Sequence, residues 1–365
     1  MIPIAEPCLG EEELKNVIEA VKSGWISSKG KFIEEFERDF AKYCGVKYSV
    51  ATANGTVALH LALKALGIGK GDEVIVPALT FVATANAVTY CNAKPVFVDS
   101  HPEYWCIDPE KIEEKITKNT KAIIVVHLYG HPCDMDWIKD IAEDKGLYVI
   151  EDCAEAHGAE YKGKKVGSFG DIACFSFYGN KIITTGEGGM CLTNNEESAE
   201  KMRILRDHGM SKERRYWHEV VGFNYRMTNL QAAIGVAQLK KLDDFIEKKR
   251  QIARWYAEEL KELEDKELIR LHPEMSWAKC VYWMYSILIE DKAKISRDEL
   301  MRMLEENGIE TRPFFVPMHM LPIYSRCKKL PIAEDLAKKG INLPSSVKMN
   351  KNQVDIVTST ILRCM

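Results

Sequence analysis

Residues 147–157 read LYVIEDCAEAH, in which a short apolar run leads directly into acidic side chains, among them Asp152 and Glu155. The run has the length and the β-branched content of a strand. Ligands of open α/β sheets bind outside the carboxyl ends of the strands. Asp152 is therefore a candidate site residue, although for this stretch alone a solvated loop aspartate is an equal alternative.

Similar apolar runs recur along the first half of the chain, and each is followed by residues with helical spacing. The runs cover residues 48–51, 74–76, 96–98, 122–126, 147–150 and 173–177. This alternation is typical of βαβ units with a parallel sheet that is covered on both faces. The sequence therefore predicts an α/β fold with a mostly parallel sheet.

The sequence pattern changes after residue 240. A long charged helix is expected over 242–263 and a strand over 285–289. We predict a large domain over 1–240, which includes an N-terminal arm, and a small α/β domain over 241–365 that begins with the bridging helix.

Two helix boundaries are explicit in the sequence. The apolar spacing of residues 14–21 predicts a helix that ends at Gly24, and Ser296 with Glu299 predicts a capping box at the start of a helix that Gly308 ends.

Composition excludes several classes of protein. The chain has 365 residues, of which 46% are hydrophobic and 28% charged, so it is neither disordered nor fibrous. A net charge of −4 gives no general attraction to nucleic acid or to a membrane surface. We find no run of about 20 apolar residues and no C-x-x-C pair among 11 cysteines, so we expect a cytoplasmic protein.

A second candidate element is Ala53-Asn54-Gly55-Thr56, between an expected strand and an expected helix. Free N–H groups at a helix start attract phosphate, and Gly55 allows a ligand to approach the main chain closely. The alternative is that Asn54 is an ordinary helix N-cap.

The third element is Lys181, which ends the stretch SFYGNK at residues 176–181 and precedes the glycine-rich stretch TTGEGG at 184–189. A lysine between a strand and such a turn is unlike a random surface lysine, because the glycines permit close backbone packing around its amine. A phosphate seat, an acid for a ring nitrogen and a lysine able to form a Schiff base together describe a site for pyridoxal 5'-phosphate (PLP).

With these motifs the chain resembles the DegT-type sugar-nucleotide aminotransferases, which have the aspartate-aminotransferase superfold (fold type I of PLP enzymes), from Ala5-Glu6-Pro7 to residues 342–345. The resemblance implies that Lys181 carries the cofactor, that Asp152 pairs with its ring nitrogen, and that the enzyme is a homodimer with shared active sites. It implies further cofactor contacts from Gly55, Thr56 and Ser176 to the phosphate, from Phe81 to the ring, and from Asn224 to the neighbouring subunit's phosphate. Many relatives have Gln where Glu155 stands, which leaves the ionisation of Glu155 open.

Residues 24–30, 216–220 and 311–319 most resemble the GDP-perosamine synthases within that family. This resemblance implies transfer of an amino group from L-glutamate to GDP-4-keto-6-deoxy-D-mannose, whereas UDP- and dTDP-linked keto sugars are alternative acceptors. Candidate substrate-binding residues are Trp25, Arg226, Arg312 and His319.

Two rival functions share the cofactor, namely a PLP-binding regulatory protein and a PLP-dependent sugar dehydratase. The dehydratases similar to this family have His at the lysine position, so Lys181 favours amino transfer. The turn at residues 127–134 carries His, Cys and Asp but no fourth convergent ligand, and we expect no metal site.

Overall fold

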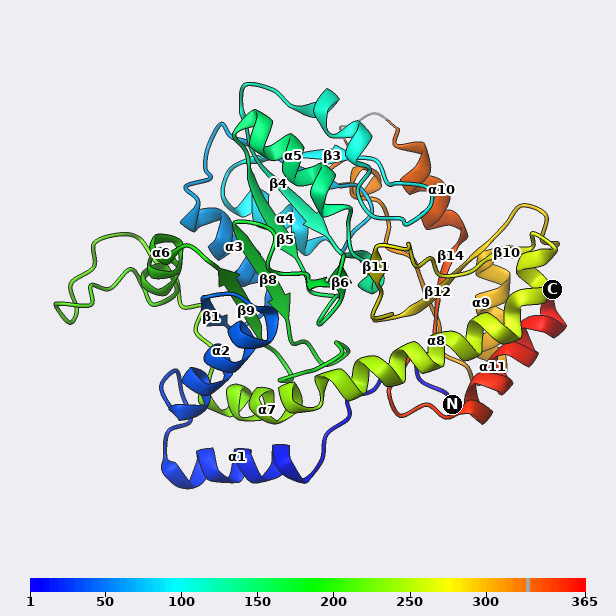
Figure 1. Cartoon of the computed structure of the whole chain (residues 1–365), viewed down its shortest axis with the longest axis horizontal. Helices are drawn as coiled ribbons and strands as arrows, with labels where there is room; N and C mark the ends of the chain where they lie inside the picture. The colour runs from blue at the N-terminus through cyan, green and yellow to red at the C-terminus, as the bar shows by residue number, and fades with distance from the viewer. Residues whose placement is uncertain (326–328) are drawn as a thin grey trace.

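The computed structural model describes residues 1–325 and 329–365. Its centre is a seven-stranded sheet in the order β1-β9-β8-β5-β4-β2-β3 (Figure 1). Strand β9 is antiparallel to both neighbours, and the other adjacent pairs are parallel, which confirms the predicted α/β class with a mostly parallel sheet. The strands are β1 (Tyr48–Thr52), β2 (Glu73–Pro77), β3 (Lys94–Val98), β4 (Thr120–Val126), β5 (Tyr148–Asp152), β8 (Ile172–Ser176) and β9 (Gly189–Thr193).

Strand β9 is the member of this sheet that the sequence pattern did not predict. Gly188 and Gly189 suggest a turn, and the three residues after them, Met190 to Leu192, include no β-branched side chain. Pairing with β1 and β8 on both sides makes this segment a strand, so tertiary context decides its conformation.

Helices cover the sheet, and in Figure 1 α1 and α7 lie side by side below it, whereas α5 lies above it. Helix α1 ends at Gly24, whose φ of 75° is left-handed, as the sequence predicted. The buried carboxylate of Glu13 accepts hydrogen bonds from Gln238 and Lys241, both at 2.7 Å, and so joins the two helices. The helices of this part are α1 (Glu11–Ser23), α2 (Lys31–Cys44), α3 (Gly55–Ala65), α4 (Ala83–Tyr90), α5 (Met135–Lys145), α6 (Glu196–Arg206) and α7 (Asn229–Lys240).

Helix α8 (Leu242–Asp265) is long and contributes to two separate hydrophobic cores. Ile246 belongs to the core around the large sheet, whereas Tyr256 and Leu260 belong to the second core. The second core is built by β10 (Ile269–Arg270), β12 (Tyr285–Ile289), β13 (Arg312–Pro313), β14 (Gly340–Leu343), α9 (Arg297–Glu306) and α11 (Lys351–Cys364). The capping box of Ser296 and Glu299 starts α9 as predicted.

Not every residue after α8 belongs to the second core. Val281, Trp283 and Phe314 pack into the core of the large sheet, and α10 (Pro331–Lys339) adds the buried side chains of Ala333 and Leu336 to it. The C-terminal part of the chain therefore contributes side chains to the core around the large sheet.

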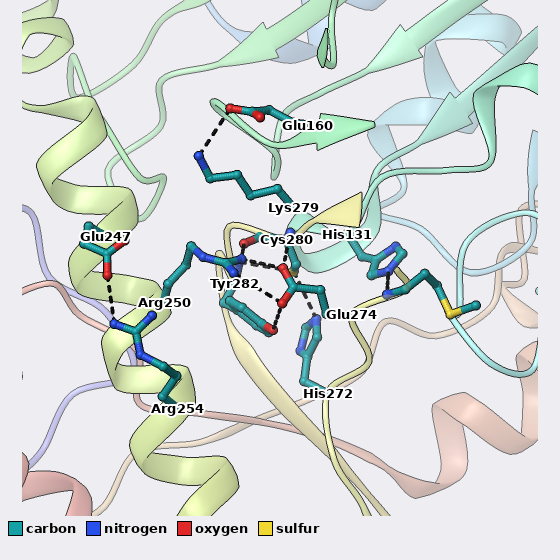
Figure 2. A network of polar contacts seen from close by, with 11 residues as sticks. His131, Glu160, Glu247, Arg250, Arg254, His272, Glu274, Lys279, Cys280 and Tyr282 are labelled. Carbon is teal, nitrogen blue, oxygen red and sulfur yellow. Dashed lines mark hydrogen bonds and ion pairs between the residues drawn. The ribbon is translucent and has the colours of Figure 1, made fainter. Parts of the chain in front are cut away.

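A polar network ties the segment before β12 to α8 (Figure 2). Glu274 accepts hydrogen bonds from Arg250 of α8, from the backbone N–H of Cys280 at 2.8 Å and from the hydroxyl of Tyr282 at 3.3 Å. A small sheet of β11 (Ala278–Lys279), β6 (Glu160–Tyr161) and β7 (Lys164–Lys165) joins the same segment to the large domain.

Short 3₁₀ turns complete the secondary structure of the described residues, at Pro109–Lys111, Glu113–Lys115, Leu128–Gly130 and Met318–Met320. None of the helices that the structure describes is long and apolar enough to cross a bilayer.

Candidate active site

A cavity of about 690 Å³ opens where β5 and β8 end. One side, which we call the sheet wall, contains six residues predicted from the sequence, namely Gly55, Thr56, Asp152, Glu155, Ser176 and Lys181. The opposite side, the C-terminal wall, is formed by Trp283, Arg312 and Phe315. Phe81 also lines the cavity.

The start of α3 forms an anion seat in the sheet wall. Asn54 caps the helix by accepting a hydrogen bond from Val57 N–H at 3.0 Å, whereas the N–H groups of Gly55 and Thr56 have no acceptor among the described residues. A Cβ at position 55 would lie 2.7 Å from the Cβ of Ser176, so only glycine fits there. Asn54 is thus an N-cap, and the same helix start offers two donors to an anion.

Asp152 ends β5 with both carboxylate oxygens engaged. Oδ2 accepts a hydrogen bond from the hydroxyl of Thr84 at 2.9 Å, and Oδ1 accepts from Ala154 N–H at 3.2 Å. The hydroxyl of Thr80 lies 3.0 Å from that of Thr84, and both threonines are buried. Burial raises the pKa of Asp152, and the hydrogen bond from Thr84 opposes this rise.

Sequence reasoning missed Thr84, although it stands in the stretch TFVAT that was interpreted for Phe81 alone. The sequence around Thr84 does not indicate that its hydroxyl bonds to a carboxylate on another element. The hydrogen bond depends on how the start of α4 lies relative to the end of β5.

Lys181 lies in the turn after β8, where its amine faces two carboxylates and an indole. Burial lowers the pKa of Lys181, and the charges of Glu155 and Asp152 oppose that change. The Nζ atom lies 3.8 Å from the ring centroid of Trp283, which sequence reasoning also missed. A buried amine with a lowered pKa is suited to act as a nucleophile and as a base near neutral pH.

Glu155 is buried beside Lys181. One of its oxygens accepts a hydrogen bond from Tyr129 N–H at 2.7 Å, where the backbone is left-handed with a φ of 51°. Burial raises the pKa of Glu155 to about 7. Both protonation states of this carboxyl are therefore accessible at neutral pH.

The C-terminal wall faces these groups with aromatic rings and one guanidinium. The rings of Phe315 and Phe81 lie 5.8 Å apart, and Phe81 is 54% exposed, so its face is available to a planar ligand. Arg312 is exposed and donates to Glu310 at 3.2 Å. Tyr129 fixes this wall by accepting a hydrogen bond from Phe315 N–H at 3.2 Å.

The other predicted residues lie outside the cavity as the described residues form it. Trp25 lines a separate hollow of about 820 Å³ between α1 and α2. Arg226 pairs with Asp207 at 2.5 Å and donates to Asn224 at 3.1 Å, and His319 contacts Glu334 at 2.9 Å. The substrate and cofactor roles of Trp25, Asn224, Arg226 and His319 remain predictions.

His127, Glu151 and Cys153 form a buried cluster whose potential ligand atoms lie within 4.8 Å of one another. Glu151 is already saturated, because it accepts from the N–H groups of residues 167, 169 and 170 at 2.7–2.8 Å and contacts His127 at 3.2 Å. We therefore interpret the cluster as a tie between β5 and the loop before β8.

The groups of the sheet wall fit pyridoxal phosphate. The helix start can hold the phosphate, Asp152 can face the ring nitrogen, and Lys181 offers the primary amine that such a cofactor needs. Glycine at position 55 keeps the backbone of the cradle close to Ser176.

Comparison with known proteins agrees with this site. The profile of the DegT/DnrJ/EryC1/StrS aminotransferase family matches residues 7–362. The chain is 50% identical to a GDP-perosamine synthase of Escherichia coli O157:H7, over 99% of this chain and 97% of that one, and 49% identical to that of Caulobacter vibrioides, with the same coverage. Among solved structures the chain is similar to the aminotransferase TlmJ of Streptoalloteichus hindustanus, with a TM-score of 0.93 and 32% identity over 99% of this chain and 98% of that one. It is also similar to the putative sugar aminotransferase Spr1654 of Streptococcus pneumoniae in its PLP-form, with a TM-score of 0.92 and 27% identity over 100% of this chain and 99% of that one. The resemblance inferred from the sequence is confirmed, and the chain belongs to the DegT/DnrJ/EryC1/StrS aminotransferase family.

Proposed function

We propose that this aminotransferase uses pyridoxal phosphate to transfer the amino group of L-glutamate to GDP-4-keto-6-deoxy-D-mannose, giving GDP-perosamine and 2-oxoglutarate. It acts as a homodimer in the cytoplasm. The observation that carries the proposal is the buried amine of Lys181, which faces Asp152 and Glu155 above an anion seat at the start of α3. The choice of sugar is supported by relatives named GDP-perosamine synthase over nearly the whole chain.

Each part of the sheet wall has a physical task in this reaction. The N–H groups of Gly55 and Thr56, with the hydroxyl of Ser176, hold the phosphate. The Asp152 carboxylate stabilises a proton on the ring nitrogen, because the buried charge then has a counter-charge. When bound, the cofactor supplies an electron sink for the charge left on a carbon that loses its proton.

Lys181 moves that proton. Its amine would anchor the cofactor and, when free, would take a proton from one carbon and return it to the next. Burial favours the neutral amine, which is the form that accepts a proton. One side chain can therefore serve both half-reactions.

Arg312 supplies the guanidinium of the cavity among its described lining residues. We assign it to an anionic group of the substrate, either the diphosphate of the nucleotide or the carboxylate of the donor, since a guanidinium binds both in a bidentate manner.

A substrate panel tests the proposal. The full-length protein is given glutamate with GDP-, UDP- and dTDP-linked 4-keto-6-deoxy sugars, and the products are identified by mass. We expect amination of the GDP sugar with stoichiometric release of 2-oxoglutarate, and no turnover by Lys181→Ala. Turnover of only a UDP or dTDP sugar would overturn the choice of nucleotide. A protein that binds the cofactor but shows no spectral change with any amino donor would be a regulator.

A further inference from the structure

Trp283 contacts the Lys181 amine, although it lies about 100 residues further along the chain. Its indole ring centroid lies 3.8 Å from Nζ, and its Nε1–H donates to the carbonyl of Asn180, the residue before the lysine, at 2.8 Å. The Trp283 side chain is 6% exposed, and both it and Lys181 line the cavity. One indole thus meets both the amine of Lys181 and the backbone that carries it.

The indole is held in place by contacts that do not involve Lys181. The carbonyl of Trp283 accepts a hydrogen bond from the buried amine of Lys249 on α8 at 3.0 Å. A Cβ at Gly130, where φ is 98°, would lie 3.0 Å from the backbone nitrogen of Trp283, so this loop packs tightly against it. The ring is nearly parallel to that of Tyr129, with an interplanar angle of 18°.

The preceding segment is fixed to the same helix. Glu274 joins Arg250 of α8 to Cys280 and Tyr282, as Figure 2 shows. The indole is therefore positioned by contacts within the chain itself.

The Lys181 amine has no hydrogen-bond acceptor among the described residues. Asp152 is engaged by Thr84 and Ala154, and Oε2 of Glu155 accepts from Tyr129 N–H. An indole face attracts an ammonium group electrostatically and needs no lone pair for this. Trp283 can therefore stabilise the charged amine without neutralising either carboxylate.

We propose that Trp283 is a positioning residue for Lys181, whose π-face holds the amine in the cavity and favours its protonated form whenever the amine is not covalently bound. The indole thereby offsets part of the effect of burial, which favours the neutral amine. It also keeps the protonated amine of Lys181 in the cavity. The consequence for turnover rests on the proposed function, whereas the contact itself does not.

The protonation of Lys181 can be read without turnover. Full-length protein is freed of bound carbonyl compounds by dialysis against cysteine and labelled with acetic anhydride, which reacts only with the neutral amine. Mass spectrometry of the Lys181 peptide at each pH gives the midpoint of labelling. Trp283→Leu should lower this midpoint by about one pH unit, and Trp283→Phe, which keeps an aromatic face, should stay within about half a unit of the native value.

Trp277→Leu is the matched control, because Trp277 packs against Tyr161 and does not contact Lys181. Since Trp283→Leu could fail to fold, the same midpoint is also measured in native protein that carries fluorinated tryptophans, which keep the shape of the ring but weaken its π-face. The midpoint should fall as fluorine is added.

An unchanged midpoint in the fluorinated protein, or an equal fall in Trp283→Phe and Trp283→Leu, would overturn the proposal. Failure of the proposed function would instead show as native protein with no cofactor on Lys181, whatever the labelling midpoint.

Discussion

The two walls of the cavity are built by different means. In the sheet wall, Asp152 and Ser176 end neighbouring parallel strands, so their place follows from local strand and turn structure. In the C-terminal wall, Trp283 is held by a long-range contact to Lys249 of α8, whereas Arg312 donates to Glu310, two residues before it. The comparison indicates that the reactive groups sit on the rigid sheet edge, whereas the opposite wall positions what they act on.

The largest loss is expected from Lys181→Ala in the sheet wall. Removal of the amine should reduce transamination by about 10⁴-fold or more, because the same group anchors the cofactor and transfers the proton. The initial rate of 2-oxoglutarate release measures this effect. Lys165→Ala is the control, since Lys165 pairs with Glu160 on a small sheet and should leave the rate unchanged. Comparable losses in both variants would show that the effect is structural.

Asp152→Asn should lower kcat by about 10²- to 10⁴-fold while the fold is retained, because an amide cannot supply the charge that stabilises a proton on the ring nitrogen. Circular dichroism and the rate of turnover check the two parts of this prediction. An unimpaired rate would remove Asp152 from the mechanism.

Thr84→Val sharpens the comparison of the two walls, since Thr84 acts on the sheet wall through its hydrogen bond to Asp152. Loss of a hydrogen bond to a charged group costs about 1.5–3 kcal/mol, which corresponds to about 10- to 100-fold in rate. Thr84→Ser restores the hydroxyl and should recover most of the rate. Thr80→Val is the matched control one step further from the carboxylate and should have a smaller effect. If Ser and Val variants behave alike, the hydroxyl is not the cause.

Glu155→Gln should change the pH dependence more than the maximal rate. The pKa of Glu155 is raised to about 7, so the neutral form, which can donate a hydrogen bond as an amide does, is lost as the pH rises through 7. We expect kcat/KM of the native protein to decline with a midpoint near 7, and the Gln variant to lack this limb. A native profile that is flat around pH 7 would contradict the assignment.

The same group gives a second readout in stability. Because the folded-state pKa lies above the ordinary value of 4.5, the native protein binds this proton more tightly than the unfolded chain does. The contribution of Glu155 to the free energy of unfolding is therefore present below pH 4.5 and is lost as the pH rises to about 7. Denaturant unfolding of native protein and Glu155→Gln across that range measures the difference.

The sheet wall was largely predictable from the sequence. The strand that ends at Asp152, the turn at Lys181 and the helix start at Gly55 are local patterns, and parallel topology brings their ends together. The C-terminal wall was less predictable from the sequence. Arg312 was suggested by a resemblance, whereas Trp283 was not predicted, because its contact with Lys181 depends on packing between segments about 100 residues apart.

Strand β9 differs from the sequence prediction for the same reason. Strand β9 lacks a local strand signal and exists because two neighbours pair with it. His319 is buried against Glu334, and its contact with the substrate stays a prediction. Trp25 and Asn224 are exposed and are not among the described residues that line this cavity, so their roles stay predictions.

Reduction of the native protein with borohydride, followed by mass spectrometry of its peptides, tests the central claim most directly. We predict that the phosphopyridoxyl group is found on the peptide that carries Lys181, and that Lys181→Ala protein shows no such group on any lysine. A native protein in which Lys181 stays unmodified, or in which another lysine carries the group, would contradict the account.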